Sequence, residues 1–154
     1  MKFDRLNQIL QVAANIGVIL SITFLAIELG QNQEMMRAQT RNELSQGIVG
    51  LLSTGITDPE FLTAVQKGRT GQELSSLEQN QFDRYANMLF RYWEDVHYQY
   101  RNGLFDEAEY GAQTAAIQRA MSGPGLFRFW CDRKAEYSPE FVSEINRLRP
   151  DDQC

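Results

Sequence analysis

The stretch "LNQILQVAANIGVILSITFLAI", from Leu6 to Ile27, decides the fold because it runs for 22 residues without one formal charge. Twelve of these residues are Leu, Ile, Val or Phe. As a helix the stretch would rise about 33 Å, which matches the roughly 30 Å hydrocarbon core of a bilayer. The sequence therefore predicts an N-terminal transmembrane anchor helix within residues 1–30.

The predicted helix has two different sides. At about 100° per residue, the small residues Ala13, Gly17 and Ser21 form one stripe, and the amides of Gln11 and Asn15 lie beside it. Small residues spaced by four let two backbones approach, and amides can hydrogen-bond across such a contact. We therefore predict helix association through these five residues. The remaining arc is bulky and apolar and is expected to face lipid; it holds Ile9, Val12, Ile16, Ile19, Leu20, Thr23 and Ile27.

Three other interpretations compete with a membrane span. A helix that is apolar all round can be the buried core of a soluble protein. A cleaved signal peptide is the second, but the apolar block is long and no A-x-A site follows it. A helix lying flat at the membrane interface is the third, and it would need a polar face rich in Lys and Arg.

The helical pattern does not stop at Ile27. No proline interrupts the next thirty residues, and Leu44, Ile48 and Leu51 keep a helical spacing. We therefore expect the anchor helix to continue into the first helix of a following domain. That domain is predicted over residues 31–150, with a tail at 151–154.

Helix start and stop signals divide the rest of the chain. Asp58 and Pro59 are typical of a helix start, and Gly68 is predicted to end that helix, with a loop over residues 69–76. The "SSLE" at residues 75–78 is a capping box that opens a helix over about 77–102, closed by Gly103. Its apolar positions follow a three–four spacing: Phe82, Tyr85, Ala86, Leu89, Trp93, Val96 and Tyr100.

Three further helices are predicted towards the C-terminus. The "DEAE" at residues 106–109 opens one that runs to about Met121, and the "SGPG" at 122–125 is expected to be a turn. A short helix over about 126–135 follows, and "SPEF" at 138–141 opens the last one, with Pro150 just beyond its end. Since no segment is typical of a strand, the predicted fold is all-α: one transmembrane helix continuing into a small up-and-down or orthogonal bundle.

Charge and motifs exclude several functions. The net charge is −5, and residues 1–45 carry four basic and four acidic side chains, so the acidic excess lies in the C-terminal part. This argues against nucleic acid as a partner, because nucleic-acid binding needs a basic surface. No phosphate-binding, dinucleotide, nucleophile-elbow or zinc-ligand spacing is present, so we predict no enzyme activity, cofactor or metal. Cys131 and Cys154 are too few for a disulfide scaffold, and nothing near Cys131 indicates a catalytic thiol.

The strongest predicted helix carries two weaker signals. Glu94-x-x-His97 is half of a di-metal carboxylate motif, and a homodimer would be needed to supply the second histidine. Eight aromatic residues lie between residues 82 and 105, where they either wall a pocket for a flat apolar ligand such as a quinone or simply fill the core. The residues considered for ligand or partner contact are Tyr92, Trp93, His97 and Tyr98, of which Tyr92 and Tyr98 fall off the apolar face.

The whole chain resembles a bacterial family of unknown function whose members have an N-terminal membrane helix and a small helical domain. The resemblance rests on five blocks in the same order: "IGVILSITFLAIELGQNQEMMRAQT" (16–40), "DPEF" (58–61), "YQYRNGLFDE" (98–107), "SGPGLFRFW" (122–130) and "SPEFV" (138–142). It implies an architecture and no activity. Its members usually carry an arginine directly after the apolar run, where this chain has Gly30, and that arginine would favour a cytoplasmic domain.

Together these observations predict a single-pass protein of the bacterial inner membrane, in contact with lipid. It would act through protein–protein contact, as a homo-oligomer or an accessory subunit of a membrane complex. The side of the helical domain stays open, with a slight preference for the cytoplasm, because Lys2 and Arg5 before the span balance Arg37 and Arg41 after it. The alternatives are a helical bundle that binds a small ligand or metal, and an oligomeric pore lined by the first helix.

Overall fold

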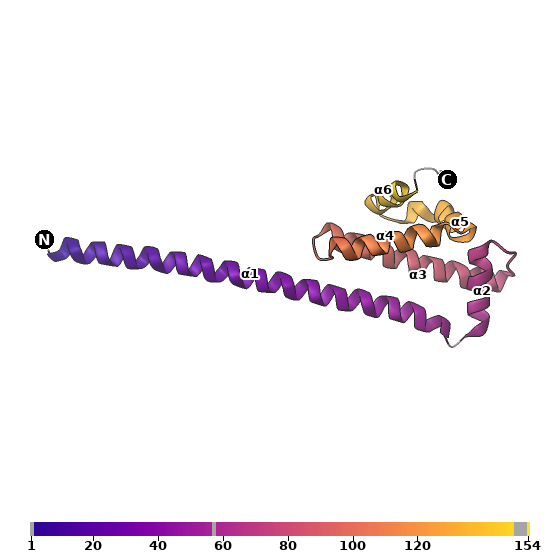
Figure 1. Cartoon of the computed structure of the whole chain (residues 1–154), viewed down its shortest axis with the longest axis horizontal. Helices are drawn as coiled ribbons and strands as arrows, with labels where there is room; N and C mark the ends of the chain where they lie inside the picture. The colour runs from indigo at the N-terminus through magenta and orange to yellow at the C-terminus, as the bar shows by residue number, and fades with distance from the viewer. Residues whose placement is uncertain (1, 57, 150–153) are drawn as a thin grey trace. The chain divides into compact units, whose positions relative to one another are not determined.

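The computed structural model describes residues 2–56, 58–149 and 154, and nearly all of them lie in helices (Figure 1). No strand occurs in this part of the chain, so the predicted all-α fold, an apolar N-terminal helix followed by a helical bundle, is confirmed. The elements are α1 (Lys2–Ile56), α2 (Pro59–Thr70), α3 (Ser76–Arg101), α4 (Glu107–Met121), α5 (Pro124–Arg133), the short 3-10 helix η1 (Lys134–Glu136) and α6 (Pro139–Leu148).

The chain forms two compact units, residues 1–39 and residues 40–154. We call the second unit the helical domain. Helix α1 contributes to both units, because it runs without a break from Lys2 to Ile56. This confirms that the apolar N-terminal helix continues into the first helix of the domain.

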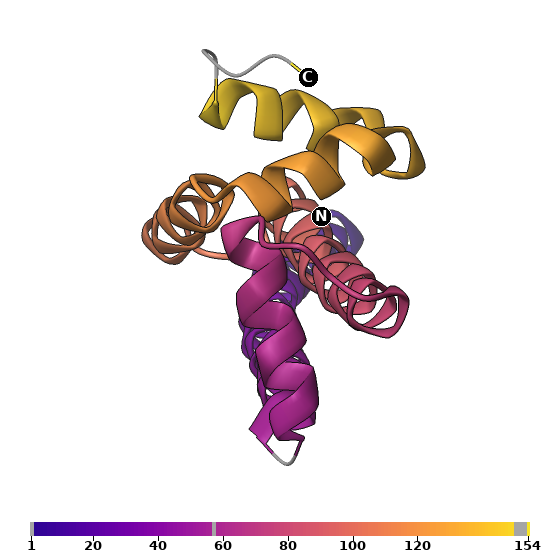
Figure 2. The ribbon, with the colours of Figure 1, turned by 90° about the vertical axis from the view of Figure 1, so that its right-hand side faces the viewer.

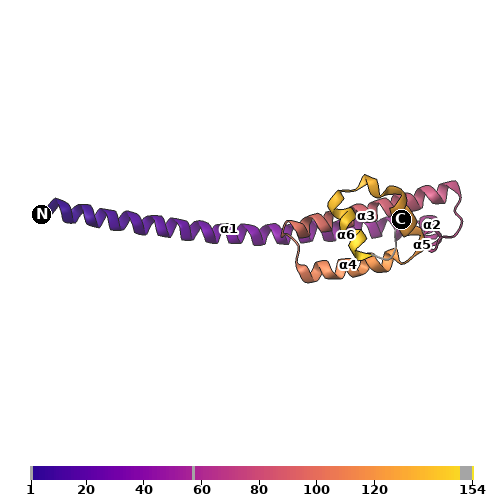
Figure 3. The same ribbon diagram turned by 90° about the horizontal axis from the view of Figure 1, so that it is seen from above.

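Helix α3 is the centre of the helical domain and packs against α2, α4, α5 and α6. Helices α3 and α4 lie side by side and run in opposite directions (Figure 3), while α2 crosses α3 (Figure 2). The bundle is therefore orthogonal rather than simply up-and-down. The apolar stripe predicted on α3 forms most of its buried face, with Phe82, Ala86, Leu89, Trp93 and Val96 all buried.

Phe90, which the predicted stripe omitted, is the most central aromatic residue of the core. It is completely buried, and its ring stacks on Trp130 at 5.2 Å and on Phe129 at 5.8 Å between ring centroids. Trp93 meets the same ring edge-on at 5.3 Å. Because offset and edge-to-face pairs add about 0.5–1.5 kcal/mol each beyond burial, this cluster fixes α5 against α3.

The second half of α1 is part of the domain core. Leu44 is buried in a cluster with Val96 and Tyr110, and Ile48 packs against the main core. The helical spacing predicted for Leu44 and Ile48 is therefore confirmed, whereas the side chain of Leu51 lies outside the described residues. Arg41 extends the same contact through an ion pair of 2.7 Å with Glu109.

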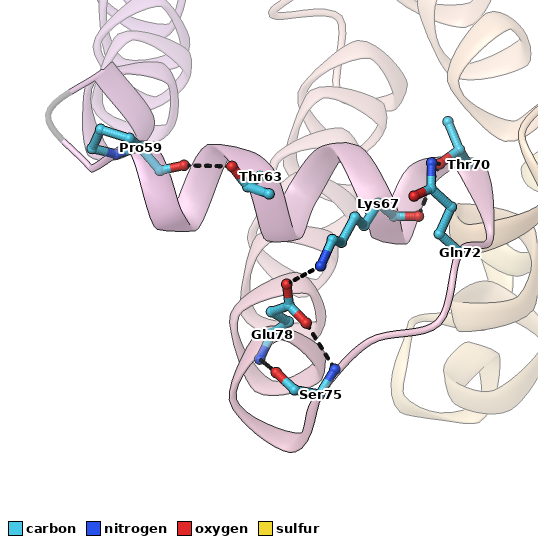
Figure 4. A network of polar contacts seen from close by, with 7 residues as sticks. All are labelled: Pro59, Thr63, Lys67, Thr70, Gln72, Ser75 and Glu78. Atoms are coloured by element: carbon cyan, nitrogen blue, oxygen red, sulfur yellow. Dashed lines mark hydrogen bonds and ion pairs between the residues drawn. The ribbon is translucent and has the colours of Figure 1, made fainter.

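Local capping chemistry sets the start of α3 and ties it to α2 (Figure 4). The predicted capping box is confirmed: Glu78 N–H donates to Ser75 Oγ at 3.3 Å, and Ser75 N–H donates to Glu78 Oε2 at 2.8 Å. Lys67 of α2 donates to Glu78 Oε1 at 2.5 Å. The hydrogen bond from Lys67, assisted by the Ser75 backbone, lowers the pKa of Glu78 to about 2.

Two predicted boundaries are wrong, and both concern glycines at a close contact. Helix α2 passes through Gly68 to Thr70 and ends at Gly71, whose φ of 73° is the left-handed conformation that glycine favours at a helix end. The loop is therefore shorter than predicted, at residues 71–75. Helix α5 begins at Pro124 rather than after the "SGPG" stretch, so Gly125 lies in its first turn.

The reason for both corrections is that α2 and α5 cross backbone to backbone. A Cβ on Gly68 would lie 2.2 Å from the Phe82 ring, and a Cβ on Gly125 would lie 1.8 Å from the Gly68 carbonyl oxygen. Neither position has room for a methyl group. Glycine at these places therefore serves packing and does not stop a helix.

Candidate functional site

The described side chains of the first unit are all exposed, from residue 3 to residue 39. The positions predicted to face lipid follow this rule, since Val12, Ile16, Ile19 and Ile27 are each more than half exposed and Thr23 is exposed too. The helix is long and apolar enough to cross a membrane, and none of its most apolar window is buried. The association side is equally exposed, so burial alone does not separate the two sides.

The small-residue stripe offers an open surface. Ala13, Gly17 and Ser21 are helical and exposed, and a Cβ placed on Gly17 would meet no atom within 4 Å. The Ser21 hydroxyl donates to the Gly17 carbonyl oxygen at 2.8 Å, and the Thr23 hydroxyl donates to the Ile19 carbonyl oxygen at 2.9 Å. Both hydroxyls are thereby satisfied within the helix, as a hydrocarbon environment requires.

The two amides beside the stripe have no such partner. Among the described residues, neither Gln11 nor Asn15 makes a side-chain hydrogen bond, and both are exposed. An amide at membrane depth needs a protein partner, because hydrocarbon offers neither donors nor acceptors. In a membrane, Gln11 and Asn15 would therefore be the groups on this side that need a partner.

The four aromatic-helix residues considered for ligand contact do not share one site. Trp93 and His97 are buried in the core of the helical domain. Tyr98 is more than half exposed, and Tyr92 is half-buried on another side of α3. The structure thus brings Trp93 and His97 into the packing and leaves Tyr92 and Tyr98 apart from each other.

His97 lies between rings contributed by two other helices. Its ring centroid is 6.1 Å from that of Tyr110 on α4 and 5.9 Å from that of Phe141 on α6. Burial lowers the pKa of His97, with Glu144 acting in the opposite direction. The Glu144 carboxylate is itself occupied, because it accepts from the Tyr110 hydroxyl at 2.8 Å and from Arg147 at 2.7 Å.

Glu94, the other half of the di-metal motif, is held by different groups. Its Oε1 accepts from Ser138 N–H at 2.7 Å, and its Oε2 accepts from Arg91 at 2.7 Å. These bonds lower the pKa of Glu94 against the effect of burial. Ser138 precedes α6 without a side-chain capping bond, so Glu94 holds the start of that helix. Within the described residues no group of three His, Cys, Asp or Glu side chains is arranged to hold a metal.

Two open hollows lie on the helical domain. One of about 300 Å³ is lined by Tyr92 and Phe105 together with the Arg41–Glu109 ion pair. Another of about 550 Å³ lies between α2 and the end of α4. Its lining includes the apolar side chains of Leu62 and Val65 and the exposed arginines Arg69 and Arg119. Each of these two hollows opens to solvent and contains no buried charged group on its walls.

The structure pairs the two cysteines, a feature that sequence reasoning missed. Cys131 of α5 and Cys154 form a disulfide, with their Cα atoms 5.2 Å apart. This distance lies within the usual range for such bonds. The one sequence signal was that the chain contains two cysteines and no more, which makes a single pair the simplest outcome of an oxidising environment.

Comparisons with known proteins provide no relative. No family model matches the chain, and neither the curated proteins nor the solved structures gave a significant match.

Proposed function

We propose that the chain is a single-pass membrane protein, and that it acts by protein–protein contact. Helix α1 would anchor the helical domain in a bacterial inner membrane, where the protein would be a homo-oligomer or an accessory subunit of a membrane complex. Its resemblance to the bacterial family with this architecture is part of the proposal. We place the function in the anchor because the groups that favour a partner, Gln11, Asn15 and Gly17, lie on this helix.

The observation that supports the anchor most is the exposure of the apolar side chains of residues 3–29. Burying one Val, Leu, Ile or Phe side chain stabilises a protein by about 1.5–3 kcal/mol. Leaving the fourteen that are exposed between residues 3 and 29 largely in water would therefore forgo a stabilisation on the order of 10 kcal/mol or more, comparable with the whole stability of a domain. A lipid environment removes this cost without a second protein surface.

Protein contact is supported by the side of α1 that carries polar and small side chains, because this side is the least compatible with lipid. Within the part of the chain that the structure describes, the amides of Gln11 and Asn15 make no side-chain hydrogen bond, and Gly17 leaves room for a neighbouring backbone. A second helix would satisfy the amides and fill the space above Gly17. Lipid would satisfy neither amide.

A matched pair of substitutions tests this contact. Gly17→Leu places a bulky side chain in the stripe, while Ala26→Leu adds the same side chain about 180° away on the same helix. Native mass measurement in mild detergent should show an assembly that Gly17→Leu weakens about tenfold or more, since such contacts are worth roughly 1–2 kcal/mol. Ala26→Leu should leave the assembly unchanged, and Trp fluorescence should report a folded domain in both.

The same measurement separates the two forms of the proposal, homo-oligomer and accessory subunit, from each other and from a pore. An unchanged assembly in Gly17→Leu would refute the contact through the stripe. A large closed ring of copies would favour the pore lined by Gln8, Gln11 and Asn15. A single chain that co-purifies with another membrane protein would favour the accessory subunit.

A further inference from the structure

The disulfide between Cys131 and Cys154 carries information about the environment of the helical domain. Cys131 is half-buried on α5, and Cys154 is exposed. The bond closes a loop over residues 131–154 that contains α6, whose Phe141 and Ile145 are part of the core. A covalent link at this place holds the last helix on the bundle.

A disulfide that involves an exposed cysteine, such as Cys154, persists only where the surroundings are oxidising. In the cytosol, glutathione and thioredoxin reach such a bond and keep its thiols reduced. On the outer side of the inner membrane, the two thiols can be oxidised by another protein that carries a disulfide. Both thiol protons and two electrons pass to that protein, and its disulfide is reduced to a dithiol as the Cys131–Cys154 bond forms. The two thiols of this chain need no other reaction partner.

We infer that the helical domain lies on the oxidising face of the membrane, with the N-terminus of α1 on the cytoplasmic side. This inference rests on the proposed function, because it requires α1 to span the bilayer. It reverses the slight preference for a cytoplasmic domain that we drew from the sequence.

The charges beside the span agree with this orientation. Lys2 and Arg5 lie four residues and one residue before Leu6, whereas Arg37 and Arg41 lie ten and fourteen residues after Ile27. Lys and Arg close to a span favour the cytoplasmic side. The basic residues nearest the apolar stretch are therefore those of its N-terminal end.

Thiol counting in bacterial cells tests the redox half of the inference. The full chain is expressed, quenched in acid, denatured and treated with a maleimide polymer that adds a visible mass to each free thiol. Because the chain has two cysteines, we expect no added mass without reduction and two additions after reduction. The variant Cys154→Ser should show one addition without reduction. Two free thiols in the untreated membrane-bound chain would overturn the inference.

Labelling from outside tests the orientation half. In the variant Cys131→Ser, the exposed Cys154 should react with a membrane-impermeant maleimide in intact spheroplasts, and this readout does not depend on the disulfide. Labelling of Cys154 only after the membrane is opened would place the domain in the cytoplasm and overturn the inference, while the anchor itself would stand. Recovery of the chain in the soluble fraction would instead refute the anchor, and the orientation with it.

Discussion

Gly125→Ala is the substitution for which the packing of the helical domain predicts the clearest loss of stability. The added Cβ would lie 1.8 Å from the Gly68 carbonyl oxygen and 3.2 Å from the Arg69 Cα. Carbon and oxygen atoms in close contact lie about 3.3–3.6 Å apart, so α5 would have to move by more than about 1 Å from α2. The obstacle is backbone on both sides, so no flexible side chain can give way.

The expected loss in the free energy of unfolding follows from this displacement of α5. Overpacking a well-packed core costs about 1–3 kcal/mol, and a backbone clash belongs at the upper end of that range. The gain from replacing a helical glycine, about 0.5–1 kcal/mol, offsets only part of it. We therefore expect a net loss of about 2 kcal/mol, which lowers Tm by roughly 5–10 °C for a domain of this size.

Thermal unfolding followed by tryptophan fluorescence measures this effect in the domain alone. Trp93 and Trp130 are both buried there, and the chain has no other tryptophan. Gly111→Ala is the matched control, because a Cβ on this helical glycine meets no atom within 4 Å; it should raise Tm slightly. If Gly125→Ala unfolds at or above the wild-type temperature, the close crossing of α2 and α5 is wrong.

Three further predictions concern the same domain. Replacing Cys131 and Cys154 by Ser should lower the free energy of unfolding by about 3 kcal/mol, because the disulfide restricts the unfolded chain between two cysteines that are 23 residues apart. Chemical denaturation measures this loss. Burial lowers the pKa of His97, so the stability that the neutral imidazole provides is complete above the unfolded pKa of about 6.5 and is lost as the pH falls towards the folded pKa. His97→Leu should reduce this loss of stability in thermal melts between about pH 7 and pH 5.5. Glu94→Ala should cost about 1–3 kcal/mol by leaving Ser138 N–H unpaired, and amide exchange near the start of α6 should accelerate.

Local signals in the sequence were sufficient to predict the helix starts. Asp58 accepts from Glu60 N–H at 3.0 Å and from Phe61 N–H at 3.1 Å, and the capping box at Ser75 and Glu78 is complete. Such caps act within four residues, so they can be recognised without knowing the tertiary structure. The apolar stripe of α3 was predictable for the same reason, because it follows the period of the helix.

Long-range features were not predictable in this way. Gly68 has the local appearance of a helix stop, but the approach of Phe82 and Gly125 explains it, and those residues are distant in sequence. The role of Glu94 as the acceptor for Ser138 N–H also links positions 44 residues apart. The pairing of Cys131 with Cys154 depends on the path of α6.

The position of the small-residue stripe on α1 was predictable because it depends on helical geometry alone, whereas its role in association stays a prediction. The period of the helix places Ala13, Gly17 and Ser21 in one line, and the structure keeps that line helical and exposed. The hydrogen bond from Ser21 to the Gly17 carbonyl was not foreseen. The proposed contact therefore depends on the amides of Gln11 and Asn15 rather than on this hydroxyl.

Alkaline extraction of membranes from cells that express the full chain tests whether α1 spans a bilayer. We expect the chain to stay in the membrane pellet, with residues 6–27 present by intact mass. Ile16→Arg, near the middle of the apolar stretch, should release much of the chain, because the exchange costs about 3–4 kcal/mol at the bilayer centre. A chain that is washed out at high pH, or that has lost its N-terminal segment, would show that α1 is not a membrane anchor.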